Sequence, residues 1–345
     1  MKIYYDSGYV NMGGILDEGI PFNFIVGGRG TGKTYDALKD SKEKDERFML
    51  LRRTQTEADL ISKPEFSVFK PLNADLGWNV QVKKVSKYNS VFYENEGTVE
   101  EPITRIVGYT GALSTIANMR GFDASDIKRL IYDEFIPEEH VRPIKKEGEA
   151  LLNAYETMNR NRELKGLPPL QLVCLANSNE IRNPVFEELK LIRIADKMQK
   201  TETSRWIDEK RGIQIIMLFR SPISKKKANT ALYRLTQGTE FSAMSIDNDF
   251  RVDRSHIKPR PIAEFIPVCS VGELCIYRHK SDGRLYATTH LSGVFNKTYS
   301  LTDTDRLHYQ RLYRSHWDMY VAGKIDFEDV LAEKMFIKYW EMVNI

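Results

Sequence analysis

The chain has 345 residues, 41% of them hydrophobic, 29% charged and 11% aromatic, which suits a globular protein of about two domains and excludes a disordered one. Its net charge of +3 neither requires nor excludes a nucleic-acid partner. The longest apolar run, around 213–219, is too short to span a membrane, and the N-terminus has no secretory pattern. The three scattered cysteines fit neither a disulfide framework nor a structural zinc site. We therefore expect a protein of a reducing cytoplasm without a membrane partner.

The first two-thirds of the chain alternate short β-type runs with helical stretches, which is typical of an α/β domain with a mainly parallel sheet flanked by helices. The clearest helix is expected over 149–162, because Leu151, Tyr155 and Met158 recur on one face. The strands are expected over 22–26, 48–52, 104–109, 129–132, 170–176 and 212–219.

The composition changes after this domain, which we assign to residues 1–221. Residues 222–255 are predicted to form a connector that begins with lysines at 225–227. Beyond it, runs at 274–279 and 284–290 flank a Ser-Asp-Gly turn and predict a hairpin, and helices are expected at about 302–321 and 326–340. Residues 256–345 are therefore predicted to form a small α+β domain.

The strongest motif is GGRGTGKT at 27–34, which fits the phosphate-binding loop pattern GxxxxGK[ST] and follows directly on an expected strand. Lys33 is expected to reach the β- and γ-phosphates, and the Thr34 hydroxyl to ligate Mg²⁺. The motif predicts ATP and Mg²⁺ as cofactors, and the absence of an NKxD motif disfavours GTP. The loop residues expected to surround the phosphates are Gly27, Gly28, Arg29, Gly30, Thr31, Gly32, Lys33 and Thr34.

A second motif follows where the strand at 129–132 runs into Asp133 and Glu134. Asp133 is predicted to hold the Mg²⁺ shell and Glu134 to orient the attacking water; a solvated acidic turn is the alternative. The expected strands at 48–52 and 104–109 lie between the two motifs and leave room for an inserted strand, and a glutamate directly follows the aspartate. This arrangement predicts a motor-type (ASCE-type) P-loop NTPase.

Three further polar residues are candidates for the site. Asn177, after the strand at 170–176, could sense the γ-phosphate or simply form a turn. Arg160 could stabilise the charge of the transition state, also in a neighbouring subunit, or could form a surface pair with Glu156. Arg120 is a second candidate arginine, with a loop ion pair as its alternative role.

Basic stretches could contact the phosphates of DNA, but charged runs are more often solvated surfaces. Arg52 and Arg53 at the end of the second strand and the lysines at 225–227 are the clearest examples. Both interpretations fit the residues.

The ordered set of motifs resembles the DNA-packaging ATPases (encapsidation proteins) of small short-tailed bacteriophages of the phi-29 type. The segment at 238–248 lies outside any ATPase motif and makes the resemblance specific. The matching segments are 24–34, 51–53, 132–136, 160–163, 174–178 and 238–248.

The resemblance implies a homomeric ring, a pentamer, that docks on the portal of an empty procapsid in the host cytoplasm and drives double-stranded DNA inward with ATP, with a structural RNA as a further candidate partner. It implies that such a ring is absent from the mature virion. It also implies that Arg160 acts in trans and that Arg120 lies at the subunit interface. The best-known relative carries a lysine two positions after its arginine pair, and Gln55 here puts a DNA contact at that position in doubt.

The resemblance implies that the C-terminal domain is a reduced RNase H-like nuclease fold without a working metal site. Consistent with this, 256–345 shows no set of three carboxylates on strand ends, so we expect no nuclease activity. Two alternatives are a helicase-like or terminase-type DNA motor with its own nuclease, and a nucleotide-sensing assembly module that does not hydrolyse ATP.

Overall fold

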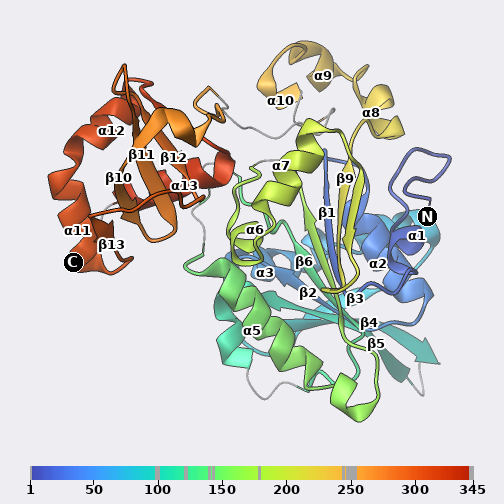
Figure 1. Cartoon of the computed structure of the whole chain (residues 1–345). Coiled ribbons are helices and arrows are strands. Elements are labelled where there is room, and N and C mark those ends of the chain that lie inside the picture. The colour runs from blue at the N-terminus through green and yellow to red at the C-terminus, as the bar shows by residue number, and fades with distance from the viewer. Residues whose placement is uncertain are drawn as a thin grey trace. The chain divides into compact units, whose positions relative to one another are not determined.

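The computed structural model describes residues 2–97, 102–119, 123–138, 141, 144–177, 180–242, 245 and 255–341 (Figure 1). The chain divides into two compact units. Met1–Leu189 and Lys197–Arg251 form the first, and Lys190–Asp196 and Val252–Ile345 form the second. The domain boundaries at 221 and 255 stay predictions.

The first unit contains a nine-stranded sheet in the order β3-β4-β5-β2-β6-β7-β1-β9-β8. Strands β5, β2, β6, β7, β1 and β9 run parallel, and β3, β4 and β8 add antiparallel pairs at the two edges. The strands are β1 (Phe22–Gly27), β2 (Phe48–Arg52), β3 (Gln81–Lys84), β4 (Asn89–Gly97), β5 (Pro102–Ala112), β6 (Arg129–Asp133), β7 (Gln171–Ala176), β8 (Arg205–Asp208) and β9 (Ile213–Leu218).

The predicted parallel α/β sheet is confirmed, and each of the six predicted strands is present. The central strands were recognisable because both of their faces are buried and their sequences are almost continuously apolar. Strands β3 and β8 escaped prediction because edge strands bury little. Only Val82 is buried in β3, and no residue of β8 is fully buried.

The expected inserted strand is present between the strands of the two motifs, and it is β7. Strand β7 lies between β1 and β6, whereas the strands that contain 48–52 and 104–109 lie beyond β6. In the sequence, β7 follows both motifs rather than separating them. Parallel pairing places the carboxyl ends of β1, β7 and β6 side by side, which brings the two motifs together at the carboxyl end of the parallel strands.

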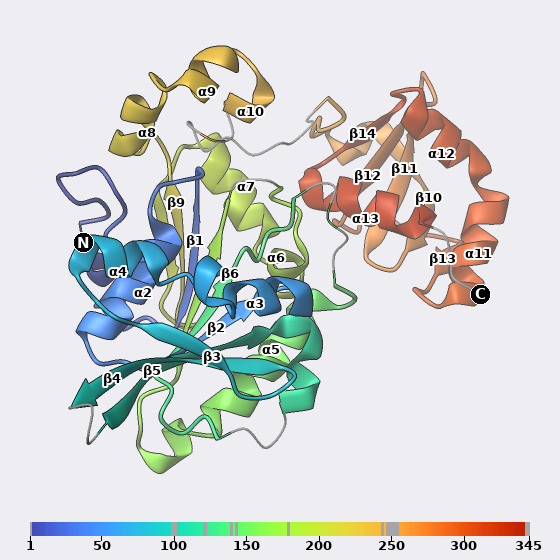
Figure 2. The ribbon, with the colours of Figure 1, turned by 180° about the vertical axis from the view of Figure 1, so that it is seen from behind.

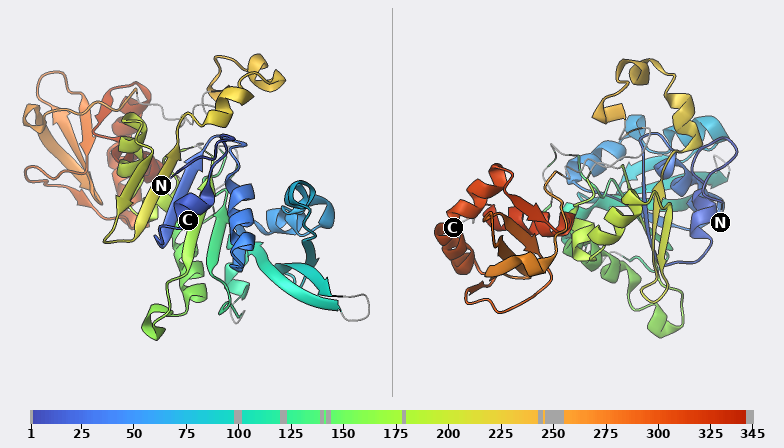
Figure 3. Two further views of the ribbon diagram at one scale, coloured as in Figure 1. Left: turned by 90° about the vertical axis from the view of Figure 1, so that its right-hand side faces the viewer. Right: turned by 45° about the horizontal axis from the view of Figure 1, so that its top comes forward.

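Helices cover both faces of this sheet. Figure 1 shows α5 and α6 in front of the sheet, and Figure 2 shows α2, α3 and α4 in front of its other face. Neighbouring residues of β1 divide between the two layers: Ile25 belongs to a core cluster with Leu38 of α2, and the ring of Phe24 packs against Phe186 of α6. The left view of Figure 3 shows α2 (blue) against one face.

The helices before the second unit's sheet have the following bounds: α1 (Met12–Leu16), α2 (Lys33–Glu43), α3 (Gln55–Ile61), α4 (Lys70–Leu76), α5 (Glu147–Asn159), α6 (Pro184–Glu188), α7 (Ile192–Lys200), α8 (Pro222–Lys227), α9 (Ala231–Leu235) and α10 (Glu240–Ser242). Within the described ranges no helix is long and apolar enough to cross a bilayer.

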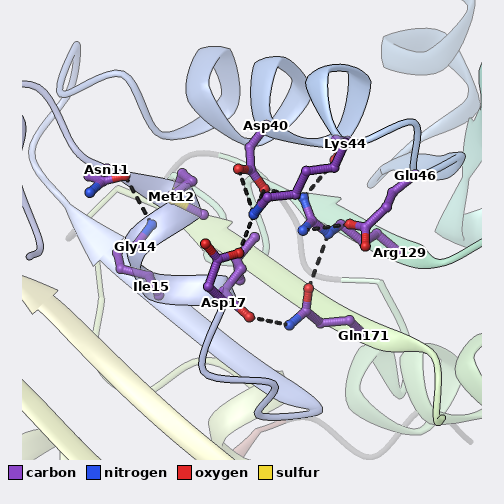
Figure 4. A network of polar contacts seen from close by, with 12 residues as sticks. Asn11, Met12, Gly14, Ile15, Asp17, Asp40, Lys44, Glu46, Arg129 and Gln171 are labelled. Atoms are coloured by element: carbon purple, nitrogen blue, oxygen red, sulfur yellow. Dashed lines mark hydrogen bonds and ion pairs between the residues drawn. The ribbon is translucent and has the colours of Figure 1, made fainter. Parts of the chain in front are cut away.

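A buried arginine connects α2 to the amino end of β6, at the end of the strands opposite the two motifs (Figure 4). Arg129 is 3% exposed, and its guanidinium donates to Asp40 at 2.6 Å and to Gln171 at 3.1 Å. Glu46 forms a further ion pair with it at 2.6 Å. Since α2 follows the glycine-rich loop at 27–34 and β6 leads into the acidic pair, these contacts hold the two motifs in register from their far ends.

The second unit contains a five-stranded sheet in the order β13-β10-β11-β12-β14. The predicted hairpin is confirmed as the antiparallel pair β11–β12. The strands are β10 (Phe265–Val271), β11 (Leu274–His279), β12 (Leu285–Thr288), β13 (Thr298–Tyr299) and β14 (Ile325–Phe327), and the helices are α11 (Asp303–Leu312), α12 (Arg314–Val321) and α13 (Val330–Trp340).

Two helix predictions in this unit were partly wrong. The stretch 302–321 forms two helices, because Tyr313 leaves the helical conformation at φ −118° and ψ 33°. The stretch 326–340 begins as strand β14. Its helix starts only at Val330, where the Asp329 side chain accepts a hydrogen bond from the backbone of Ala332 and caps the first turn.

Candidate functional site

The loop at 27–34 joins β1 to α2, and its residues 29–34, but not Gly27 or Gly28, line a cavity of about 370 Å³. Gly30 and Gly32 have φ angles of 67° and 90°, a left-handed conformation that glycine adopts without strain. The cavity is lined by Arg29, Gly30, Thr31, Gly32, Lys33, Thr34, Tyr35, Asp133, Glu134, Ala176 and Asn177. The structure thus brings together both motifs and Asn177, which the sequence separates widely.

Lys33 lies at the base of the cavity, only 7% exposed. Its ammonium donates to the carbonyls of Gly27 and Gly28, each at 2.9 Å, and lies 3.3 Å from the Asn177 amide oxygen. Burial lowers the pKa of Lys33 to about 8, and the nearby Asp133 carboxylate opposes that shift. Within the described part of the chain, the hydrogen bonds of this strongly desolvated ammonium go to neutral oxygens, so it is well placed to accept an anionic ligand.

Thr34 and Asp133 supply oxygen atoms of the kind that Mg²⁺ prefers. The Thr34 hydroxyl donates to the two carboxylate oxygens of Asp133 at 3.0 and 3.1 Å, although the residues come from α2 and β6. Magnesium sites in nucleotide enzymes commonly use one or two carboxylates with phosphate oxygens and water, so this pair fits the ion. Among the described residues no group of three or more His, Cys, Asp or Glu side chains could hold a metal by itself.

Glu134 follows β6 in a left-handed conformation, with φ 60°. Its backbone N–H donates to Asp133 at 3.1 Å, and its side chain is 55% exposed toward the cavity. Burial of part of the carboxyl raises the pKa of Glu134, and the Arg52 guanidinium opposes that shift. The positive φ turns Glu134 away from the course of the strand, so both carboxylates line one cavity.

Arg52 is a site residue that the sequence did not identify. It ends β2, beside β6, and its guanidinium lies 3.2 Å from Asp133 and 3.1 Å from Glu134. Its neighbour Arg53 is 2% exposed and forms a two-point ion pair with Glu147 at 2.9 and 2.8 Å. In this structure both arginines have carboxylate partners, and neither belongs to a solvated basic surface.

The N-terminal segment packs against the glycine-rich loop at 27–34. The backbone N–H of Val10 donates to Thr31 at 3.0 Å, and that of Met12 donates to the Asp36 carboxylate at 2.7 Å. The ring of Tyr9 lies so close to Gly32 that a Cβ atom there would come within 3.2 Å of it. Gly32 therefore has two reasons to be glycine, its φ angle and this close approach.

Arg160 is not among the residues that line its own chain's cavity. It follows α5, which connects the parallel strands β6 and β7. The helix therefore runs back from the carboxyl end of β6 and ends near the amino end of β7, away from the cavity. Its guanidinium forms an ion pair of 3.4 Å with Asp123, and its side chain is 41% exposed. Arg162 is buried and donates to the carbonyl of Ser125 at 3.1 Å, which ties the end of α5 to the loop before β6. Arg120, the second candidate, lies outside the described residues.

Comparisons with known proteins point to one group. A sequence model of the family described as podovirus DNA encapsidation protein (Gp16) matches residues 5–334. The DNA packaging protein of Bacillus phage PZA is 25% identical over 294 residues, which are 82% of this chain and 79% of that protein. The DNA packaging protein of Bacillus phage phi29 is 26% identical over 234 residues, 66% of this chain and 61% of that protein.

Solved structures show the same fold. A structure of the bacteriophage Phi-29 viral genome packaging motor assembly aligns with a TM-score of 0.66 and 21% identity, covering 98% of this chain and 100% of that one. A structure of the Phi-28 gp11 DNA packaging motor aligns with a TM-score of 0.62 and 19% identity over 98% of this chain and 99% of that one. The predicted fold class, an α/β domain with a mainly parallel sheet flanked by helices and a small C-terminal α+β domain, is confirmed.

Proposed function

This chain belongs to the podovirus DNA encapsidation protein (Gp16) family, and from that premise we propose that it hydrolyses ATP to drive double-stranded viral DNA through the portal into an empty procapsid. The observation that carries the proposal is the single cavity that unites the glycine-rich loop, Lys33 and the acidic pair Asp133–Glu134. The names of its relatives, DNA packaging proteins of Bacillus phages, support the biological process.

The residues of the cavity have different roles in phosphoryl transfer. The backbone of the loop and Lys33 bind the β- and γ-phosphates. Thr34 and Asp133 would hold Mg²⁺, which when bound would supply positive charge beside the phosphate oxygens. Glu134 accepts a hydrogen bond from the attacking water and orients it. Arg52 bridges both carboxylates, so its position governs whether Glu134 is available to the water.

The active form is proposed to be a homomeric ring, a pentamer, at the portal vertex of the procapsid in the host cytoplasm. The position of Arg160 supports assembly, because it lies at the edge of the sheet away from its own cavity. In a ring, the Arg160 of one subunit reaches a neighbour's γ-phosphate and stabilises the transition state. Arg120 and a structural RNA remain candidate contributors to the subunit and portal contacts.

Packaging is tested by mixing the protein with procapsids, portal, structural RNA and viral DNA. ATP-dependent protection of the DNA from DNase supports the proposal, and Lys33→Ala should remove the protection. A chain that binds ATP but shows no turnover even with DNA and procapsids would instead support the assembly module.

Nucleotide binding is expected to take up a proton at Lys33 above about pH 8. In the free protein the pKa of Lys33 is lowered to about 8, so between about pH 8 and pH 10 much of this side chain is neutral. Triphosphate favours the charged form and raises that pKa, so affinity falls as the pH rises through this range. Calorimetry at about pH 8.5 in two buffers of different ionisation enthalpy measures the uptake. Lys33→Arg stays charged and should show none, and equal heats in both buffers for the unaltered protein would contradict the prediction.

The second unit is expected to have no nuclease activity. Its carboxylate Asp326 is 1% exposed and is matched by Arg260 at 2.9 Å and Arg284 at 3.2 Å, which leaves little negative charge for a metal ion. Supercoiled plasmid incubated with Mg²⁺ or Mn²⁺ should stay intact. Cleavage that disappears when carboxylates of this unit are replaced would favour the terminase-type alternative.

A further inference from the structure

A lysine from the connector lies against the phosphate-binding loop. Helix α8 directly follows β9, which pairs with β1, and in Figure 1 it lies beyond the end of β9. Its last residue, Lys227, donates a hydrogen bond from its ammonium to the carbonyl of Arg29. The same nitrogen would lie 3.3 Å from a Cβ atom on Gly30. The ammonium therefore bonds to the loop at Arg29 and lies beside Gly30, two consecutive residues that line the cavity.

Two aromatic rings continue this contact into the connector. The Lys227 ammonium lies 4.9 Å from the centroid of the Tyr233 ring, a cation–π distance, and Tyr233 is 8% exposed. The Tyr233 ring stacks on Phe241 of α10, with centroids 6.2 Å apart and planes 17° apart. A row of three side chains thus runs from the loop through α8 and α9 to α10.

The charge around the loop favours an anion there. Lys227 is one of the groups that lower the pKa of Lys33, as is Arg29, so three cations share the surroundings of one loop. Arg29 pairs with Glu138, but among the described residues the contacts of Lys227 are a neutral carbonyl and an aromatic ring. A phosphate oxygen is a stronger acceptor for an ammonium than a peptide carbonyl, because the bond is then charge-assisted on both sides.

We propose that Lys227 binds the terminal phosphate of the nucleoside triphosphate and thereby couples the occupied site to the connector. With the triphosphate bound, the ammonium exchanges the Arg29 carbonyl for a γ-phosphate oxygen. The rings of Tyr233 and Phe241 move with it. With the diphosphate bound, Lys227 keeps its hydrogen bond to the Arg29 carbonyl. The inference rests on the proposed function, since it requires that the loop at 27–34 binds ATP.

The test compares the affinity of the full chain for a non-hydrolysable ATP analogue and for ADP, by calorimetry. Lys227→Met keeps the apolar stem and removes the charge. It should weaken binding of the triphosphate analogue about tenfold or more and change ADP affinity by less than about twofold. Lys226→Met is the matched control: Lys226 is exposed, belongs to the same helix and donates to the carbonyl of Ser7 at 3.2 Å. It should change neither affinity.

A second measurement follows the coupling itself. Phe241→Trp places a fluorophore beside Tyr233, and its emission should change with the triphosphate analogue but not with ADP. Adding Lys227→Met should remove that change even at a saturating concentration of the analogue. A ratio of triphosphate to ADP affinity that Lys227→Met leaves unaltered would overturn the inference. If instead Lys33→Ala does not weaken binding of either nucleotide, the proposed ATP site fails, and this inference fails with it.

Discussion

Glu134→Gln is expected to lower the DNA-stimulated rate of ATP hydrolysis by about 10²–10⁴-fold, the usual contribution of a group that handles the proton of a nucleophile. Glutamine has nearly the same shape but cannot take a proton from the water. ATP affinity should change little, because Lys33 and the Thr34–Asp133 pair stay in place. Phosphate release measured with DNA and procapsids, together with calorimetric ATP binding, separates the two effects.

Glu149→Gln is a matched control for this substitution, because it removes the same charge from an exposed ion pair with Lys146. It should leave both the rate and the affinity unchanged.

The unaltered protein should lose activity as the pH falls. Burial raises the pKa of Glu134, so this carboxylate is protonated at a higher pH than an ordinary glutamate. Turnover by Glu134→Gln at the normal rate would show that another group orients the water.

Arg160→Ala is expected to lower hydrolysis by about 10³–10⁵-fold, the contribution of an arginine that stabilises the charge on a transferring phosphoryl group. If Arg160 serves a neighbour, mixing Arg160→Ala subunits with Lys33→Ala subunits should restore part of the activity. At some interfaces of the mixed rings, a Lys33→Ala subunit donates its intact Arg160 to the intact cavity of its neighbour. The rate of ATP hydrolysis is the suitable measurement, because movement of DNA can require every subunit.

A mixture of Lys33→Ala and Glu134→Gln subunits is the control. Both residues belong to the same cavity, so no mixed interface regains a complete site and activity should stay low. Hydrolysis at the normal rate by Arg160→Ala alone would contradict the role in trans. Restored activity in the control mixture would show that subunits exchange or complement by another route.

The local motifs were predictable because each is a short run whose conformation depends on its own residues. At 27–34, glycines occupy the positions with positive φ, and the preceding apolar strand and following helix confirm the expected context. Asp133 and Glu134 were recognisable as candidates because Asp133 ends a fully buried strand and Glu134 follows it. Asn177 was recognisable because it directly follows the buried strand β7. Spacing along one strand or turn carries that information without reference to the rest of the chain.

The sequence by itself therefore determined the α/β class, the buried strands, and the glycine-rich loop and acidic pair as candidate site residues. Only the tertiary structure decided that β7 separates β1 from β6, and that Arg52 contacts both carboxylates while Arg53 pairs with Glu147. It also decided that Lys227 contacts the loop rather than a solvated surface. The physical reason is that a charged side chain looks the same in sequence whether water or a distant partner surrounds it, and its partner is chosen by the packing of strands and helices far apart along the chain.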